Sequence, residues 1–288
     1  MSIGDGDARP AAVISSDGDH QVKLGEIRCK TILGKSGIGG VDYSVNPYLG
    51  CAHGCAYCYA RFMRRMGHKG EAWGSFVDAK VNALERLRVE APRRRKGKVL
   101  LSSVTDPYQP LERKYELTRG SLQILLEHQF PISILTKSDL VLRDLDIIRK
   151  FDVCEVGFTI TAFDDEVRRA FEPGASPVEA RLAALKELSA EGISTWAFIG
   201  PVLPYLTDEG VERLLNELAG SVNHIIVDRL NVKSGNMPDI RRVLTERYPD
   251  LKTLFESALR DESEYYTVFK RNVTELCLRR SIPCEIVY

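Results

Sequence analysis

Three cysteines, Cys51, Cys55 and Cys58, stand close together in the sequence with the spacing C-x3-C-x2-C. Gly50 precedes the first cysteine and Gly54 precedes the second, so the backbone between them can turn tightly. A tight loop can direct three thiolates toward one point, and thiolate is the soft ligand that iron–sulfur clusters and zinc select. The spacing therefore predicts a metal-binding loop.

Three kinds of site compete for this loop. Disulfides are disfavoured because the chain has seven cysteines, an odd number, because no signal peptide is visible, and because cytosolic thiols stay reduced. Structural zinc needs four ligands and no second paired half is present, although His53 or His68 would be available. A cluster of four irons and four sulfurs on three cysteines leaves one iron open to a small molecule, which suits a catalytic site.

The residues around the cysteines match a known pattern. The loop with its flanks resembles the radical S-adenosylmethionine (radical SAM) superfamily, and in particular its spore photoproduct lyase-like branch. The similarity extends over about residues 40–235. Besides residues 42–48 and 59–61, it rests on Thr105-Asp106-Pro107-Tyr108-Gln109-Pro110, Glu112, Leu117-Thr118-Arg119 and Leu135-Thr136-Lys137-Ser138.

The resemblance implies two cofactors, a 4Fe-4S cluster and S-adenosyl-L-methionine. In that family the open iron binds the amine and carboxylate of S-adenosylmethionine, and one electron from a flavodoxin- or ferredoxin-like donor breaks its C5′–S bond. The resulting 5′-deoxyadenosyl radical takes a hydrogen atom from the substrate. Such chemistry needs a dry, closed pocket, which the protein must supply.

Composition excludes few function classes. The chain has 288 residues, enough for one α/β domain with a sizeable core. Its 40 basic and 40 acidic side chains balance, so no global field indicates nucleic acid or membrane as a partner. No apolar run approaches the ~20 residues that span a bilayer. We therefore expect a soluble, cytoplasmic protein, and its oligomeric state is left open.

The hydrophobic pattern divides the chain into three parts. Residues 1–20 are small and polar and predict a flexible tail. Residues 21–235 form the expected core together with its N-terminal approach segment. Within it, apolar stretches at 45–49, 99–104, 132–135, 154–160, 193–199 and 224–230 predict six strands, and helices are expected at 59–66, 76–90 and 208–219 among others. Residues 236–288 predict helices at 238–248 and 251–278 and a short edge strand at 282–288.

Strands that alternate with helices predict a parallel sheet covered by helices. The fold class we expect is α/β, a partial (β/α)6 TIM-type barrel as in the resembled family, with the C-terminal helices closing its open side. In such barrels the chemistry gathers at the carboxyl ends of the strands. Residues at those ends are therefore the candidates for the site.

The resemblance assigns roles to several of these residues. It places Tyr57 against the adenine of S-adenosylmethionine and Tyr59 in a hydrogen-atom relay. The other cofactor-binding candidates at the strand ends are Ser102, Ser103, Thr105, Asp106, Lys137, Thr159, Thr161, Gly200 and Asn231. Each also has an ordinary reading as a turn, strand or solvated residue. We assign no chemistry to Cys29, Cys154, Cys277 and Cys284, because isolated cysteines usually pack as small apolar residues.

The substrate is not determined by the sequence. Spore photoproduct lyase uses a cysteine as hydrogen donor just before the Asp-bearing turn, and here that stretch reads Ser102-Ser103-Val104-Thr105. A basic loop at residues 93–98 leaves nucleic acid open as a partner. The alternatives are a radical enzyme that acts on a small metabolite or peptide, and a non-catalytic iron–sulfur or zinc protein.

Overall fold

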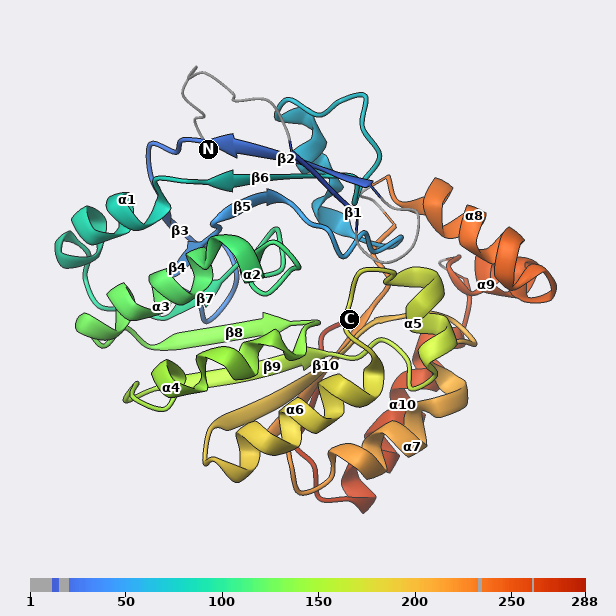
Figure 1. The fold of residues 1–288 in the computed structure, drawn as a ribbon. Coiled ribbons are helices and arrows are strands. Elements are labelled where there is room, and N and C mark those ends of the chain that lie inside the picture. The colour runs from blue at the N-terminus through green and yellow to red at the C-terminus, as the bar shows by residue number, and fades with distance from the viewer. Residues whose placement is uncertain (1–11, 16–20, 233–234, 261) are drawn as a thin grey trace. The chain divides into compact units, whose positions relative to one another are not determined.

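The computed structural model describes residues 12–15, 21–232, 235–260 and 262–288. The chain forms two compact units (Figure 1). Unit 1 comprises residues 1–54 and 60–155, and unit 2 comprises residues 55–59 and 156–288. The boundary between the compact units falls within the cysteine loop, since residues 55–59 belong to unit 2; the expected three-part division stays a prediction.

One sheet of unit 1 has the strand order β1-β2-β6-β5. It contains β1 (Ala12–Ser15), β2 (Gln21–Ile27), β5 (Tyr48–Gly50) and β6 (Phe76–Lys80). Strand β1 lies inside the segment expected to be a flexible tail and pairs antiparallel with β2; the rest of residues 1–20 lies outside the described residues. Strand β2 runs parallel to β6, and β5 runs antiparallel to it.

The prediction of one helix over residues 76–90 is wrong in its first half. Residues 76–80 form β6, which is paired on both sides, and only Ala83–Glu90 form a helix, α1. Phe76, Val77 and Ala79 are all fully buried. Val77, Leu84 and Leu87 share a helical spacing, but the strand partners on both sides take up the backbone hydrogen bonds of residues 76–80.

The other strands of unit 1 follow the order β8-β7-β4-β3. They are β3 (Leu33–Lys35), β4 (Tyr43–Val45), β7 (Val99–Leu101) and β8 (Ile132–Thr136). Strands β4, β7 and β8 are parallel, and β3 joins β4 antiparallel. The strand expected at residues 45–49 is instead two short strands, since Pro47 has no N–H for a ladder and interrupts it. As a result β4 and β5 belong to different sheets.

Helices connect these strands. The stretch after the cysteines, Tyr59–Arg65, is a 3-10 helix, η1. Unit 1 then contains α2 (Glu112–Tyr115), α3 (Leu117–Glu127) and α4 (Leu145–Ile148). Two further 3-10 turns, η2 (Ala91–Arg93) and η3 (Asp139–Asp144), precede β7 and α4. Leu122 and Leu125 of α3 are fully buried, as the apolar spacing predicts.

The strands of unit 2 follow the order β12-β11-β10-β9. They are β9 (Cys154–Thr159), which starts at the end of unit 1, β10 (Ser194–Val202), β11 (His224–Arg229) and β12 (Cys284–Ile286). Strand β11 runs parallel to β10 and to β12. Fully buried Ile199, Ile225 and Val227 belong to these strands. The final strand thus lies at the edge of the described sheet, as the proline before it predicts.

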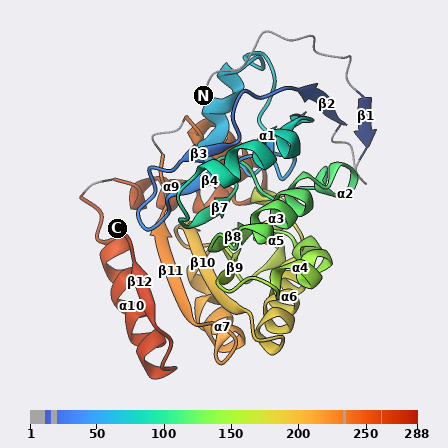
Figure 2. The ribbon, with the colours of Figure 1, turned by 90° about the vertical axis from the view of Figure 1, so that its left-hand side faces the viewer.

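The helices of unit 2 are α5 (Asp165–Phe171), α6 (Val178–Ala190), α7 (Asp208–Leu218), α8 (Met237–Arg247), α9 (Lys252–Ala258) and α10 (Tyr265–Arg279). Figure 2 shows α10 beside β12 and α7. The single helix expected over 251–278 is divided into two: α9 ends at Ala258 and α10 begins at Tyr265. A short 3-10 turn, η4 (Pro249–Leu251), leads into α9.

The expected fold class is confirmed: the protein is α/β with parallel strands and covering helices. Within neither unit do the described strands close on themselves, because β3 and β12 each have a partner on one side alone. No described helix is both long and apolar enough to cross a bilayer.

Candidate functional site

In unit 1 the cysteine loop starts at Gly50 and is held by the turn after β7. The Thr105 hydroxyl donates to the carbonyl oxygen of Gly50 at 2.6 Å. The Gln109 side chain accepts from the Ala52 amide at 2.9 Å and donates to the Thr105 hydroxyl at 2.9 Å. Cys51 lies between these anchored residues and is buried. The Thr-Asp-Pro-Tyr-Gln sequence therefore fixes the backbone on both sides of the first cysteine.

Gly50 is required at this position for two reasons. Its φ of +86° lies in the left-handed region, and a Cβ there would overlap the carbonyl oxygen and ring of Phe76. We expect Gly50→Ala to lower the free energy of unfolding by about 2–4 kcal/mol, from backbone strain plus overlap. Urea denaturation measures this. Gly220→Ala is the matched control, because Gly220 has a φ of +76° and a Cβ there would meet no atom. Its expected cost of about 1–2 kcal/mol in the free energy of unfolding measures the backbone strain alone. An equal loss of stability in both variants would contradict the overlap with Phe76.

Asp106 is a buried carboxylate that gathers groups from three elements. Its Oδ1 accepts from the Tyr108 amide at 2.9 Å and from the Thr136 hydroxyl at 2.7 Å, and its Oδ2 accepts from the Lys137 amide at 2.9 Å. Nδ1 of buried His53 lies 3.4 Å from Oδ2. Burial alone would raise the pKa of Asp106, but His53, the charge of Lys137 and the Thr136 hydroxyl outweigh it and hold that pKa below its ordinary value. Asp106 thus joins the cysteine loop to the end of β8.

Asn46 holds the residues that follow β7. Its Oδ1 accepts from the amides of Ser103 and Val104 at 2.8 and 3.1 Å, and its Nδ2 donates to the Ser103 hydroxyl at 3.1 Å. Ser102 has a φ of +66° and is buried, and its hydroxyl has no hydrogen-bond partner within the described part of the chain. A buried polar group without a partner is uncommon in a native fold and suits a site that a polar ligand completes. Among the cofactor-binding candidates, Ser102 therefore offers a buried hydroxyl that a polar ligand could engage.

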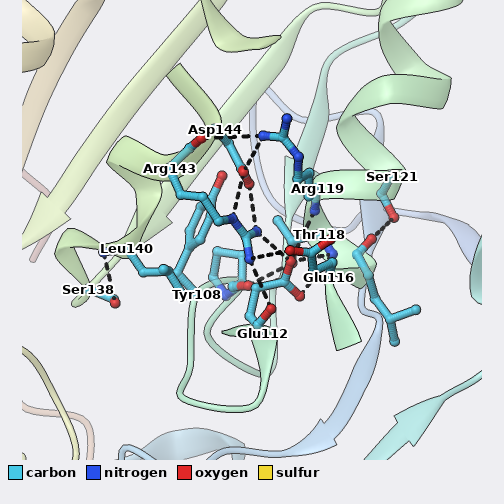
Figure 3. A network of polar contacts seen from close by, with 12 residues as sticks. Tyr108, Glu112, Glu116, Thr118, Arg119, Ser121, Ser138, Leu140, Arg143 and Asp144 are labelled. Carbon is cyan, nitrogen blue, oxygen red and sulfur yellow. Dashed lines mark hydrogen bonds and ion pairs between the residues drawn. The ribbon is translucent and has the colours of Figure 1, made fainter. Parts of the chain in front are cut away.

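A network of ion pairs around two buried carboxylates, Glu112 and Asp144, follows this turn in the sequence (Figure 3). Glu112 accepts from the Thr118 and Arg119 amides, which caps the start of α3, and pairs with Arg143 at 2.9 Å. Its other partner is the Tyr48 hydroxyl, from the strand that leads into the cysteine loop. Asp144, fully buried, pairs with Arg143 at 2.7 Å and with Arg119 at 2.8 Å. The conspicuous polar residues of the sequence motif thus hold the scaffold that supports the loop.

In unit 2 the aromatic residue between the second and third cysteines is anchored by a second buried network. The Tyr57 hydroxyl donates to Glu172 and lies 3.1 Å from the Thr161 hydroxyl, which donates to Glu172 at 2.8 Å. Arg181 pairs with the other Glu172 oxygen at 2.6 Å and donates to the Thr159 carbonyl oxygen at 2.9 Å. Burial and the Glu172 carboxylate raise the pKa of Tyr57 well above its ordinary value, so its hydroxyl stays a donor.

The backbone of the same loop is also tied down. The Ala56 amide donates to the Phe171 carbonyl oxygen at 2.8 Å, and the Asn236 side chain donates to the Tyr57 carbonyl oxygen at 2.7 Å. Cys55 and Tyr57 belong to an apolar cluster with Phe171. The side chains of Tyr57 and Cys55 are therefore held in fixed positions within unit 2.

The remaining candidates have the following surroundings. The Gly200 carbonyl oxygen accepts from the Thr161 hydroxyl at 3.2 Å. Asn231 follows β11, and its carbonyl oxygen accepts from Asn236 at 2.8 Å. Tyr59 is 52% exposed at the start of η1, in contrast to buried Tyr57. The structure gathers no three His, Cys, Asp or Glu side chains of the described residues in a metal-binding arrangement, so the ligand set Cys51, Cys55 and Cys58 stays a prediction from the sequence.

Sequence reasoning missed five residues that hold the loop or the segments supporting it: Asn46, Gln109, Glu172, Arg181 and Asn236. The first two lie inside the quoted motif, so their identity was visible although their role was not. Glu172 and Arg181 had no local signal, because each is a charged residue on an otherwise amphipathic stretch. Only their complete burial distinguishes them from solvated neighbours.

Comparison with known proteins gives matches over most of the chain. The sequence pattern of the radical SAM superfamily matches residues 45–218. An uncharacterised protein of Methanocaldococcus jannaschii is 36% identical over 258 residues, which are 90% of this chain and 93% of that protein. The radical SAM Nalpha-GlyT isomerase of Pseudomonas phage M6 is 27% identical over 185 residues, which are 63% of this chain and 38% of the isomerase.

A solved structure shares the fold. Spore photoproduct lyase with bound AdoMet and dinucleoside spore photoproduct superimposes with a TM-score of 0.65 over 92% of this chain and 81% of the lyase, at 17% identity. This confirms the predicted structural resemblance to that enzyme.

Proposed function

Because this chain belongs to the radical SAM superfamily, we propose that it binds a 4Fe-4S cluster through Cys51, Cys55 and Cys58 and cleaves S-adenosylmethionine reductively. The observation that carries the proposal is the superfamily match, which begins at residue 45 and contains all three cysteines. The anchoring of the same loop by Thr105, Gln109 and Asn236 supports it, since a metal loop must hold its thiolates in place.

When bound, the reduced cluster and S-adenosylmethionine supply a 5′-deoxyadenosyl radical that takes hydrogen from the substrate. The chain's own residues bind S-adenosylmethionine and orient it. We assign the methionine amino group to Ser102, whose buried hydroxyl has no partner within the described part of the chain, with Ser103, Thr105 and Asp106 holding that turn. Lys137 offers a cation for the carboxylate. Tyr57, Thr159, Thr161, Gly200 and Asn231 are the candidates for the adenosine and the remaining contacts.

Electrons would come from a flavodoxin- or ferredoxin-like donor, and the cytoplasm, where thiols stay reduced, is the expected compartment. The test is to reconstitute the protein with iron and sulfide under anaerobic conditions, reduce it, add S-adenosylmethionine and measure 5′-deoxyadenosine. Product at a level that follows cluster content supports the proposal. Stoichiometric zinc, a colourless protein and no product would favour a non-catalytic metal protein instead.

Replacing Ser102 by alanine tests the assignment of the amino group. We expect S-adenosylmethionine to bind about two- to thirteenfold more weakly, because one hydrogen bond contributes about 0.5–1.5 kcal/mol. Equilibrium dialysis with the reconstituted protein measures the dissociation constant. Ser121→Ala is the control, since its hydroxyl donates to the Leu117 carbonyl oxygen within α3. Unchanged binding in Ser102→Ala would remove this residue from the site.

For the substrate we keep two classes. The phage relative is an isomerase of Nalpha-GlyT, and the similar lyase structure holds a dinucleoside, so a nucleoside or nucleic-acid substrate is one class. The other is a small metabolite or peptide. Lyase chemistry of the spore photoproduct kind lacks its cysteine donor here, because Ser102 and Ser103 occupy that stretch; Tyr59 would be the residue available to a hydrogen-atom relay.

A further inference from the structure

A cavity of about 600 Å³ opens at the carboxyl end of β11 in unit 2. Its lining includes Arg229 at the last position of β11 and Asn231 just after it, Arg260 after α9, and Tyr266 and Lys270 on α10. This volume lies in the range of sites for small organic ligands. The C-terminal helices therefore form part of a pocket, in addition to any role in covering the sheet.

The charge in this cavity is unbalanced. Arg229, Arg260 and Lys270 line it, and within the described residues none of the three has a carboxylate side chain within ion-pair distance. Arginines outside the cavity lining do have such partners: Arg241 on α8 with Glu256 at 3.0 Å, and Arg279 on α10 with Glu275. The acidic side chain in the lining is Asp228, and burial raises its pKa. Lys270 also donates to the Tyr288 carbonyl oxygen at 3.2 Å.

The wall of the cavity is held in place before any ligand arrives. The Tyr266 hydroxyl donates to the Val202 carbonyl oxygen at 3.1 Å and accepts from the Leu230 amide at 3.3 Å, so it joins the ends of β10 and β11. The ring of Tyr288 packs edge-on against Tyr266 at 5.4 Å. Two aromatic rings beside three cations suit a ligand with an organic body and an anionic group.

We propose that this pocket binds a phosphate-bearing substrate, with Arg229, Arg260 and Lys270 around the phosphate and Tyr266 and Tyr288 beside the organic part. A phosphate has three acceptor oxygens and up to two negative charges. It is therefore a better match for three cations than a carboxylate ligand, which carries a single charge. Asn236 donates to the carbonyl oxygens of both Asn231, in the pocket lining, and Tyr57, between two of the cysteines. The inference rests on the proposed function in one respect, that the bound ligand is the substrate of the radical reaction.

Binding of three probes to the full-length reconstituted protein tests the proposal: ribose 5-phosphate, ribose, and a single-stranded hexanucleotide. We expect the phosphorylated sugar or the oligonucleotide to bind and ribose not to bind. The double variant Arg260→Gln/Lys270→Gln should weaken that binding at least about tenfold. Its matched control is Arg242→Gln/Arg271→Gln, which removes two exposed cations from α8 and α10 outside the cavity lining.

The outcomes separate the sources of the phosphate and the two proposals. Binding of ribose 5-phosphate identifies a free phosphate ester as sufficient, and binding of the oligonucleotide alone identifies a phosphodiester strand. No binding of either probe, or an equal loss in both double variants, overturns the pocket. S-adenosylmethionine binding and 5′-deoxyadenosine formation are measured on the same wild-type preparation. Binding of a phosphate probe without S-adenosylmethionine binding or 5′-deoxyadenosine formation would refute the proposed function and keep the pocket. S-adenosylmethionine binding and 5′-deoxyadenosine formation without binding of a phosphate probe would refute the pocket alone.

Discussion

Replacement of Cys58 by alanine is expected to lower the rate of 5′-deoxyadenosine formation at least about 10³-fold, since enzymes accelerate reactions by 10⁶-fold or more and this residue is proposed to hold the group that supplies the electron. Cys58 is partly exposed, and its amide donates to the Cys55 carbonyl oxygen at 3.1 Å, a bond that alanine keeps. The fold should therefore survive while one of three thiolate ligands is lost. Iron and sulfide per chain after anaerobic reconstitution, with product by chromatography, measure the effect.

Cys29→Ala is the control for this variant. Cys29 is likewise partly exposed, it lies outside the cysteine motif, and burial raises the pKa of its thiol. It should retain iron, sulfide and product formation at the wild-type level. If Cys58→Ala keeps a full iron content and wild-type turnover, the three-cysteine ligand set is wrong.

The second large effect is expected on stability, from Arg181→Met. Arg181 is fully buried and pairs with Glu172 at 2.6 Å, so its loss would leave a carboxylate in the interior without its cation. Breaking a buried ion pair by removing one partner costs about 3–5 kcal/mol. Urea denaturation of the protein without cluster, followed by circular dichroism, measures the loss. Because Glu172 also accepts from Tyr57, the variant should in addition loosen the residue between the second and third cysteines.

The double variant Arg181→Met/Glu172→Leu separates loss of the pair from loss of packing. Replacing both members of a buried pair by apolar residues of similar volume is often close to neutral, so the double variant should recover most of the lost stability. Arg169→Met is the surface control, because Arg169 is exposed and its pairing with Asp165 at 3.0 Å contributes about 0–1 kcal/mol. A single Arg181→Met variant as stable as the Arg169 control would show that Glu172 does not depend on its arginine.

The cysteine spacing and the alternation of strands with helices could be predicted because both are written in local sequence. A ligand spacing or an apolar run bounded by turn residues lies within a few positions, and Tyr57, Thr161 and Gly200 do meet in unit 2 as their strand-end positions suggested. The contacts of these residues with a cofactor stay predictions. What local sequence shows is where a residue sits along a strand, and what it contacts depends on other segments.

The failures have the same physical origin. The apolar residues at 76–80 continue the spacing of the helix that follows and so predict a helix, and only the pairing with β2 and β5 decides for a strand. The break in the helix expected over 251–278 has no signal in the apolar pattern, because Leu259 continues the apolar stripe although α9 ends at Ala258. The burial of Glu172 and Arg181 depends on elements whose approach no single stretch of sequence records.

Asn236 has a consequence for what the chain can tolerate chemically. Its amide nitrogen gives one proton to each of two carbonyl oxygens, 2.7 and 2.8 Å away, on segments that are far apart in sequence. Spontaneous deamidation converts this amide to a carboxylate. A negatively charged oxygen would then face two carbonyl oxygens, which are also hydrogen-bond acceptors, inside the protein. Because Asn236 bonds to both segments, neither Tyr57 nor Asn231 can shift far without stretching one of these two hydrogen bonds. A ligand that displaces the end of β11 would therefore also displace the backbone beside the cysteines, through the side chain of Asn236.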